Sequence, residues 1–247
     1  MATRRLLVSD LDGTLLGDPA ALARFARWLR EERASMVVGY ASGRRLDSVR
    51  SAVEAEGLPE PDVIISSVGT EIHDAAGRPW PGWLDRLDQG HGERARAVLR
   101  DEPGLTLQAA EHQTPFKASF DAPELGSGGL ARVGDVLKAA GVDATLVYSV
   151  DRFLDVLPRS AGKGPATRFV ASALGIDDQD VLTFGDSGND LDMLSAGFRG
   201  TIVANARPEL LTTAPRGVYR SPRTFADGVL DGIRHWSAPG SATSPGS

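Results

Sequence analysis

The sequence predicts an α/β protein in which a doubly wound parallel sheet is interrupted by an inserted α+β domain. Two observations predict this fold. Short apolar runs alternate with helical patterns towards both ends of the chain, which is typical of βαβ units. Between about residues 84 and 157 neighbouring strand patterns come in pairs, which favours an antiparallel sheet with helices. We therefore expect a core domain of residues 1–82 and 159–236, an inserted domain of residues 83–158, and a disordered tail of residues 237–247.

The first part of the core contains three buried strands and two helices. Asp18-Pro19 provides a helix cap with proline in the first turn, and apolar residues at helical spacing follow. A second helical pattern begins at Leu46, and Thr70–Ile72 with the turn Asp74–Gly77 predicts a small hairpin. The strands are expected at Leu6–Ser9, Met36–Ala41 and Asp62–Val68.

Two Pro/Gly-rich segments are expected to connect the domains. Arg78–Trp83 leads from the core into the inserted domain, and Pro158–Pro165 leads back into the second part of the core. The inserted strands are expected at Leu105–Ala109, Phe116–Asp121, Thr145–Val150 and Phe153–Leu157, with a helix at Leu130–Ala140. The later core strands are expected at Val181–Phe184 and Thr201–Ala204, and the helices at Thr167–Leu174, Asp190–Ala196, Pro208–Leu211 and Phe225–Trp236.

Composition narrows the class of protein. The chain has 247 residues and a net charge of -6, which argues against wholesale binding to nucleic acid or to an anionic membrane. It has no cysteine, so disulfides, iron–sulfur clusters and thiolate zinc sites are excluded. The first apolar run is too short for a signal peptide or a membrane span, and we expect a cytoplasmic protein.

Acidic residues follow two of the predicted strands. Asp10 and Asp12 lie just after the first strand, and Asp186 and Asp190 follow the strand that ends at Phe184. Taken alone, each pair could belong to an ordinary turn. Because ligands of open α/β sheets bind beyond the carboxyl ends of the strands, all four carboxylates are expected at one edge of the sheet. Such a cluster is costly without a cation, and its oxygens suit Mg²⁺.

Two further features favour a phosphate site at the same edge. Ser42 and Gly43 offer a hydroxyl and an amide where a helix begins, although a cap and turn would also explain them. Lys163 is one of only three lysines among 27 basic residues, and a compact ammonium suits a phosphoryl oxygen. Its alternative is a solvated surface lysine. Together these residues make a pocket where a carboxylate nucleophile can form an acyl phosphate.

The combined motifs resemble the haloacid dehalogenase superfamily, in the order Asp10–Thr14, Ser42, Lys163 and Gly185–Asp190. The inserted domain resembles the large cap of sugar-phosphate phosphatases in that superfamily. Further segments resemble the sucrose-phosphate phosphatase family, over about residues 4 to 236: Tyr40–Arg44, Val68–Ile72, Phe116–Phe120, Asp155–Pro158, Lys163-Gly164 and Ile202–Ala206. The sibling mannosylfructose-phosphate phosphatases share most of these segments.

The resemblance implies a role for each motif residue. Asp10 is the expected nucleophile, and Asp12 the acid and base for the leaving oxygen and the water. Asp10, the carbonyl of Asp12 and Asp186 are expected to hold Mg²⁺, with Asp190 acting from nearby. The remaining phosphate-site residues are expected to be Ser42, Gly43, Lys163 and Asn189.

The cap is expected to select the sugar. Lys117, on a strand of alternating character, is a candidate donor to sugar hydroxyls, or else a solvent-facing lysine. Thr70 and Glu71 are candidate sugar contacts beside the core site, although Glu71 also suits an ordinary hairpin. Arg44 either pairs with a core carboxylate or reaches the substrate, and the structural role is favoured.

The expected activity is a Mg²⁺-dependent phosphatase acting on sucrose 6-phosphate. The alternatives are another sugar phosphate (mannosylfructose, trehalose or mannosylglycerate phosphate) or a non-catalytic module that binds a sugar phosphate. A phosphomutase is disfavoured because the cap shows no second phosphate-handling feature. The resemblance also implies a sucrose-phosphate synthase-like glycosyltransferase as a candidate partner, and neither nucleic acid nor a membrane.

Overall fold

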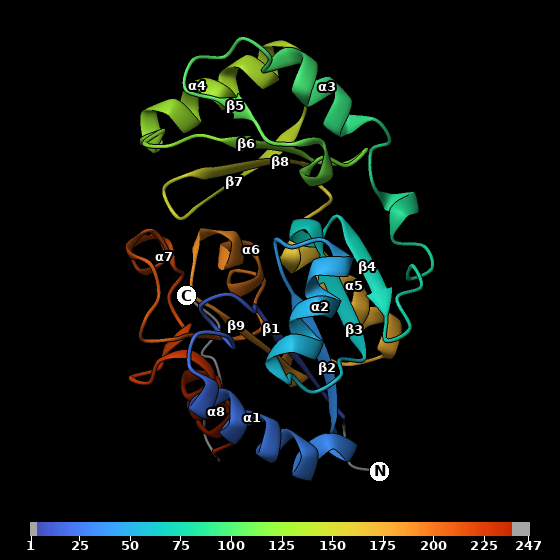
Figure 1. The fold of residues 1–247 in the computed structure, drawn as a ribbon, viewed down its shortest axis with the longest axis vertical. Helices are drawn as coiled ribbons and strands as arrows, with labels where there is room; N and C mark the ends of the chain where they lie inside the picture. Colours follow the sequence, from blue (N-terminus) through green and yellow to red (C-terminus); the bar gives the residue numbers. More distant parts are fainter. Residues whose placement is uncertain (1–3, 239–247) are drawn as a thin grey trace.

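The computed structural model describes residues 4–238, which form two lobes (Figure 1). The larger lobe holds a seven-stranded sheet in the order β11 (Tyr219–Arg220), β10 (Arg199–Ile202), β9 (Val181–Gly185), β1 (Arg5–Ser9), β2 (Met36–Ala41), β3 (Val63–Ser66) and β4 (Glu71–Asp74). All of its strand pairs are parallel except β3–β4. The predicted doubly wound core is therefore confirmed.

Helices cover both faces of this sheet. One face carries α1 (Pro19–Glu32), α2 (Leu46–Glu56) and α8 (Phe225–Ser237), and the other carries α5 (Lys163–Leu174) and α6 (Leu191–Leu194). In β1, Leu7 packs with the first group, whereas Leu6 and Val8 pack with the second. Successive side chains of a strand point to opposite faces, so an uninterrupted apolar run suits a sheet that is buried on both sides.

The smaller lobe is an antiparallel sheet that contains β5 (Thr106–Leu107), β6 (Ala118–Asp121), β8 (Phe153–Pro158) and β7 (Ala144–Ser149), in that order. Its outer face is covered by α3 (His91–Val98) and α4 (Gly126–Ala139), as Figure 1 shows. Phe120 and Leu154 are among the residues buried against these helices. On the other side of the sheet, Lys117 and Asp155 line a cavity between the two lobes. The inserted α+β unit is thus confirmed, and its polar face lies towards the core.

Several helix boundaries agree with the sequence pattern, and α1 gives the clearest case. The Asp18 carboxylate accepts hydrogen bonds from the backbone amides of Ala20 and Ala21, and Pro19 is the first helical residue. The remaining helix, α7, spans Pro208–Thr213 beyond the end of β10. Short 3₁₀ turns are η1 (Arg33–Ser35), η2 (Ser67–Gly69), η3 (Leu84–Arg86), η4 (Ala110–His112), η5 (Asp178–Asp180) and η6 (Gly188–Asp190).

The structure differs from the sequence prediction at several elements. The strand expected over 62–68 ends at Ser66, because Ser67 and Val68 adopt positive φ angles of 51° and 56° and turn the chain into η2. The strand expected over 105–109 is only two residues long. The helix expected from Thr167 already begins at Lys163, and the helix expected over 190–196 is divided into η6 and α6. The short strand β11 was not predicted.

The carboxyl-terminal part of the chain is only partly described. Helix α8 continues to Ser237, and residues 239–247 of the predicted tail lie outside the described residues. Within residues 4–238, none of the helices has the length and apolar character needed to span a membrane.

Gly69, the last residue of η2, packs against the residues where α5 begins. Substitutions at this position test how closely η2 and α5 approach each other. It has a φ of +81°, and a Cβ atom there would lie 2.1 Å from the carbonyl oxygen of Gly162. Gly57, the residue after α2, has a φ of +66° with nothing within 4 Å of the same position. We expect Gly57→Ala to cost about 1 kcal/mol for the left-handed backbone alone. Gly69→Ala should cost roughly 1–3 kcal/mol more, because backbone atoms must move.

The measurement is the free energy of unfolding in urea for both variants and the unsubstituted protein. Equal losses would contradict the close packing of η2 against the start of α5.

Candidate active site

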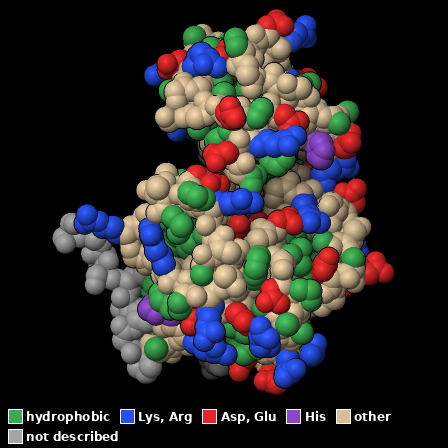
Figure 2. Space-filling model, turned by 60° about the vertical axis from the view of Figure 1, so that its left-hand side comes forward, with side chains coloured by type: hydrophobic (Ala, Val, Ile, Leu, Met, Phe, Trp, Pro, Cys, Tyr) green, Lys and Arg blue, Asp and Glu red, His purple; other side chains and the backbone are tan. Residues whose placement is uncertain are grey.

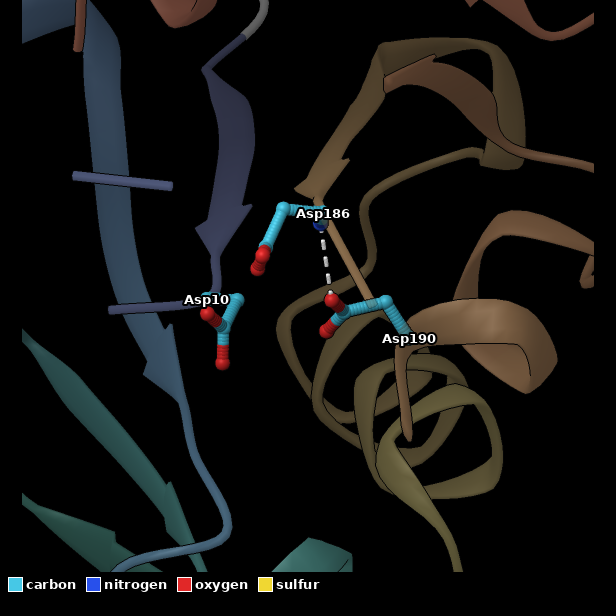
Figure 3. A group of neighbouring side chains, drawn as sticks. All are labelled: Asp10, Asp186 and Asp190. Atoms are coloured by element: carbon cyan, nitrogen blue, oxygen red, sulfur yellow. Dashed lines mark hydrogen bonds between the residues drawn. The ribbon is translucent and has the colours of Figure 1, made fainter. Parts of the chain in front are cut away.

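Three buried carboxylates meet where neighbouring strands end. Asp10 follows β1 and Asp186 follows β9, and the two strands are paired in the sheet. The Asp10 amide donates to the carbonyl oxygen of Phe184 at 3.0 Å, which fixes one loop against the other. Asp190 comes from η6, and one oxygen of each carboxylate lies within 4.8 Å of the others (Figure 3). The predicted meeting of the strand ends therefore occurs.

Lys163 lies completely buried among these groups. Its Nζ atom donates to Asp10 Oδ1 at 2.7 Å, to Asp190 Oδ1 at 2.7 Å and to Asn189 Oδ1 at 2.8 Å. Burial by itself lowers the pKa of the ammonium, but the Asp10 and Asp190 carboxylates outweigh it and the pKa is raised. The lysine is therefore a fixed positive charge rather than a proton donor, which excludes the alternative of a solvated surface lysine.

The position of Lys163 is set by the packing of α5 against α6. Asp192 Oδ2 accepts the amide proton of Gly164 at 3.0 Å and so satisfies the first turn of α5. A Cβ atom on Gly164 would lie 2.6 Å from the carbonyl oxygen of Asp192. A larger residue beside Lys163 would therefore push its helix away from the carboxylates.

Asp190 has a second role in the loop after β9. Its Oδ2 atom accepts the amides of Asp186 at 2.9 Å and Ser187 at 3.1 Å, and forms a capping box with Ser187. Both oxygens of Asp190 are thus committed, one to Lys163 and one to the backbone. Asp186 accepts a hydrogen bond from Thr14 at 3.2 Å. Its carboxylate is therefore less constrained than that of Asp190 and is the better candidate for a metal ligand.

The electrostatics of this cluster favour a cation. Burial, followed by repulsion from Asp190, raises the pKa of Asp186 to about 7, partly against the charge of Lys163. Burial likewise raises the pKa of Asp10 well above its ordinary range, although Lys163 opposes the shift. One lysine does not compensate three buried carboxylates. All donors are carboxylate oxygens, which suits a hard divalent cation.

Asp12 lies apart from the buried cluster. Its side chain is 53% exposed and accepts from Nε and Nη2 of Arg44 at 2.7 and 2.5 Å. Arg44 therefore has the core-pairing role that the sequence favoured. The amide of Arg44 donates to Ser42 Oγ at 3.1 Å, so Ser42, Gly43 and Arg44 form one loop beside Asp10.

A cavity of about 930 Å³ separates the two lobes and reaches this cluster. Figure 2 shows charged side chains of both signs where the lobes face each other. Seven carboxylates line the cavity, namely Asp10, Asp12, Asp47, Glu111, Asp121, Asp155 and Asp186. Four permanently cationic side chains also line it, namely Arg44, Arg45, Lys117 and Arg207. Ser42, Gly43 and Asn189 are further lining residues.

The three residues predicted to contact a sugar lie in different environments. Lys117 is nearly buried and donates to Asp155 at 3.0 Å, and Asp155 also accepts from Ser119 at 2.5 Å. Thr70 donates to the carbonyl oxygen of Ser67, and Glu71 accepts from Ser66. Lys117 lines the cavity, whereas Thr70 and Glu71 are not among its lining residues.

Sequence reasoning did not single out two residues of this site, Asp155 and Arg207. Asp155 lies opposite Ser119 in the β6–β8 register, and this register brings its carboxylate to Lys117, the residue just before β6. Arg207 follows the loop after β10, so an inspection of every strand end would have found it.

Comparisons with known proteins agree with this geometry. Residues 3–237 match the family model described as sucrose-6F-phosphate phosphohydrolase. The mannosylfructose-phosphate phosphatase of Agrobacterium fabrum is 36% identical, over 96% of this chain and 98% of the relative. Sucrose-phosphatase 1 of Nicotiana tabacum is 32% identical, over 99% of this chain and 61% of the relative.

Among solved structures, the sucrose-phosphatase of Synechocystis sp. PCC6803 in complex with sucrose and phosphate has a TM-score of 0.89 and 32% identity. The similarity covers 95% of this chain and 98% of that one. The chain therefore belongs to the sucrose-6F-phosphate phosphohydrolase family, a family of phosphoric monoester hydrolases within the haloacid dehalogenase superfamily.

Proposed function

We propose that the protein is a Mg²⁺-dependent phosphatase that hydrolyses a disaccharide phosphate, with sucrose 6-phosphate as the substrate. The observation that carries the proposal is the buried cluster of Asp10, Asp186 and Lys163 at the floor of a cavity shared with the cap. The family membership and the similarity to a sucrose-phosphatase support the choice of sugar. Mannosylfructose phosphate is the second candidate, because a phosphatase of that name is 36% identical over nearly its whole length.

In the proposed reaction, a carboxylate oxygen of Asp10 attacks phosphorus while the bond from phosphorus to the sugar oxygen breaks. Asp12 gives its proton to the leaving oxygen, and then takes a proton from the water that hydrolyses the aspartyl phosphate. The products are the free sugar and inorganic phosphate. Because Arg44 occupies both Asp12 oxygens, this pair has to open before Asp12 exchanges a proton with the substrate.

The remaining polar residues bind the phosphoryl group in this proposal. Lys163 offsets the repulsion between Asp10 and the incoming dianion, and Asn189 orients the ammonium through its 2.8 Å hydrogen bond. Ser42 and Gly43 donate to phosphoryl oxygens from the loop beside Asp10. Asp10, the carbonyl of Asp12 and Asp186 would hold Mg²⁺, which supplies positive charge for the phosphoryl oxygens. Asp190 supports the loop from behind.

Selection of the sugar is assigned to the cap. A core phosphate site binds one phosphate monoester much like another, so discrimination requires groups that touch the sugar. Lys117 and Asp155 present an ammonium and a carboxylate to the cavity from a rigid sheet. A site that hydrogen-bonds hydroxyl groups rejects ligands that lack them, because its polar groups are then left unpaired. Thr70 and Glu71 remain candidate contacts only if the loop around η2 moves towards the sugar.

The nucleophile is tested with Asp10→Asn. The amide is nearly isosteric but cannot form the acyl phosphate, so we expect turnover to fall below detection while a cooperative melting transition shows that the protein is still folded. Asp47→Asn removes an exposed carboxylate from the same cavity and should retain turnover. The measurement is phosphate release from sucrose 6-phosphate by rigorously purified protein. Wild-type-like turnover by Asp10→Asn would falsify the covalent mechanism.

The metal is tested through its linkage to pH. The folded protein keeps a proton on Asp186 over a pH range in which the unfolded chain has lost it, because burial raises the pKa of Asp186 to about 7. The metal-free protein should therefore lose stability as the pH rises from 3.8 towards 7. Mg²⁺ competes with this proton, so it should raise the melting temperature more at about pH 8 than at about pH 5.5.

Asp186→Ala should abolish this Mg²⁺-dependent stabilisation, whereas Asp178→Ala, which removes an exposed ion pair, should keep it. Full activity after exhaustive EDTA treatment, or an equal melting shift at both pH values, would contradict a metal at these carboxylates.

The sugar contact is tested with Lys117→Met, and Lys138→Met in α4 is the matched control, because Lys138 is exposed. We expect Lys117→Met to reduce turnover of sucrose 6-phosphate by about tenfold or more, while turnover of a small aryl phosphate changes little. Equal losses on both substrates would make Lys117 a structural residue.

The same assay over mannosylfructose, trehalose and mannosylglycerate phosphates decides which sugar is preferred. If neither these substrates nor a generic aryl phosphate releases phosphate while sugar phosphate still binds, the protein is a binding module rather than a phosphatase.

A further inference from the structure

Arg207 stands out among the residues of the cavity that the proposed reaction does not use. It lies between β10 and α7, and its amide donates to the carbonyl oxygen of Asp186 at 2.7 Å. Its own carbonyl oxygen accepts the amides of Leu210 and Leu211 in α7. The backbone of Arg207 is thus fixed against the catalytic loop, while its side chain is exposed and lines the cavity.

The charge of the cavity lining opposes the entry of an anionic substrate, and Arg207 bears on this repulsion. Even without Asp10 and Asp186, whose charge the proposed Mg²⁺ would offset, five carboxylates and four permanently cationic side chains of residues 4–238 line the cavity. A phosphate monoester carries up to two negative charges, so a cavity with an excess of acid repels it on approach. Lys163 lies beneath Asp10 and is committed to Asp10 and Asp190, so it does not offer a free charge at the entrance.

Three of the four lining cations are committed to protein partners. Arg44 is paired with Asp12, and Lys117 with Asp155. Arg45 donates through Nη1 to the carbonyl oxygen of Glu111 at 2.9 Å, and its Nε atom lies 3.7 Å from Asp47 Oδ1. Within the part of the chain that the structure describes, the Arg207 side chain has neither a hydrogen bond nor an ion pair. It is therefore the cation that can bind an incoming anion without first breaking a contact.

We propose that Arg207 is a capture residue for the phosphoryl group, which draws the substrate into the cavity and holds inorganic phosphate on its way out. A guanidinium binds phosphate oxygens through two parallel N–H donors, so it suits this role better than a point charge. This inference rests on the proposed phosphatase activity. It adds a residue that binds the anion without taking part in the chemistry.

The neighbourhood of Arg207 agrees with a position where the lobes meet. Two residues further along, Glu209 Oε1 accepts the amide of Val150 at the tip of the β7–β8 hairpin, at 3.3 Å. A Cβ atom on Gly188 would lie 2.3 Å from the carbonyl oxygen of Tyr148 in the same hairpin. Both η6 and α7 therefore contact the β7–β8 hairpin of the cap. Arg207, which precedes α7 and is hydrogen-bonded to Asp186 through its amide, lies next to this contact.

The test compares Arg207→Gln with Arg207→Lys, and uses Arg216→Gln as the matched control. Arg216 is an exposed arginine in the loop after α7 and does not line the cavity. For each protein we would measure kcat and KM for sucrose 6-phosphate, and the inhibition constant of inorganic phosphate, at low and high ionic strength. Melting curves and a Mg²⁺ titration show whether fold and metal site are intact.

We expect Arg207→Gln to raise KM and the phosphate inhibition constant by about tenfold at low ionic strength, with kcat unchanged. The difference should shrink as salt screens the charge. Arg207→Lys should restore part of the loss, and Arg216→Gln should behave like the unsubstituted protein. The inference is overturned if Arg207→Gln matches Arg216→Gln, or if it lowers kcat while phosphate binding is unchanged.

Failure of the proposed function is distinguishable from failure of this inference. If the unsubstituted protein releases no phosphate from any sugar phosphate, the proposed function fails. Calorimetric titration with inorganic phosphate and Mg²⁺ then still decides the inference, because it compares phosphate binding by the unsubstituted protein and by Arg207→Gln. Equal binding would overturn the role of Arg207, and weaker binding by the variant would support it.

Discussion

The ammonium of Lys163, buried between Asp10 and Asp190, is the interaction on which the rest of this structure depends. A lysine with no exposed surface is stable there only because two carboxylates and an amide oxygen accept hydrogen bonds from its three N–H groups. The helix that begins at this residue must approach the sheet edge closely, which small residues at positions 69 and 164 allow. The same ion pairs tie β1, α5 and η6 to one another, so the catalytic edge and the core share their main electrostatic contact.

We propose a division of roles between the floor of the cavity, which the core forms, and its roof, which the cap forms. The floor consists of backbone-anchored carboxylates at the ends of paired parallel strands, and its chemistry is common to phosphate monoesters. The roof is the polar face of the cap sheet, where Lys117, just before β6, and Asp155 in β8 line the cavity as an ion pair. An excess of carboxylates suits a cation and sugar hydroxyls, but it opposes the entry of a dianion. In our proposal, the guanidinium of Arg207 offsets this repulsion at the place where the core and the cap meet.

The fold and the buried cluster could be predicted from the sequence for a physical reason. Uninterrupted apolar runs require burial on both faces, and their alternation with helices requires parallel strands, whose carboxyl ends share one edge. Once Leu6–Ser9 and Val181–Phe184 are recognised as strands, Asp10 and Asp186 are expected at the same sheet edge, and the β1–β9 pairing makes them neighbours. Local turn geometry was harder to predict, as at Ser67 and Val68, where two residues with positive φ end a strand that the apolar pattern continues.

Local patterns in the sequence are enough to predict the α/β architecture, the inserted cap and the residues of the buried cluster, because short-range periodicity and strand-end position are local properties. The pairing of charges across the chain follows instead from the three-dimensional fold. Arg44 with Asp12, and Lys117 with Asp155, are separated by 32 and 38 residues, whereas the Arg207 side chain has neither a hydrogen bond nor an ion pair within residues 4–238. Ion pairing depends on where side chains of distant segments end up in space, and no local pattern records that.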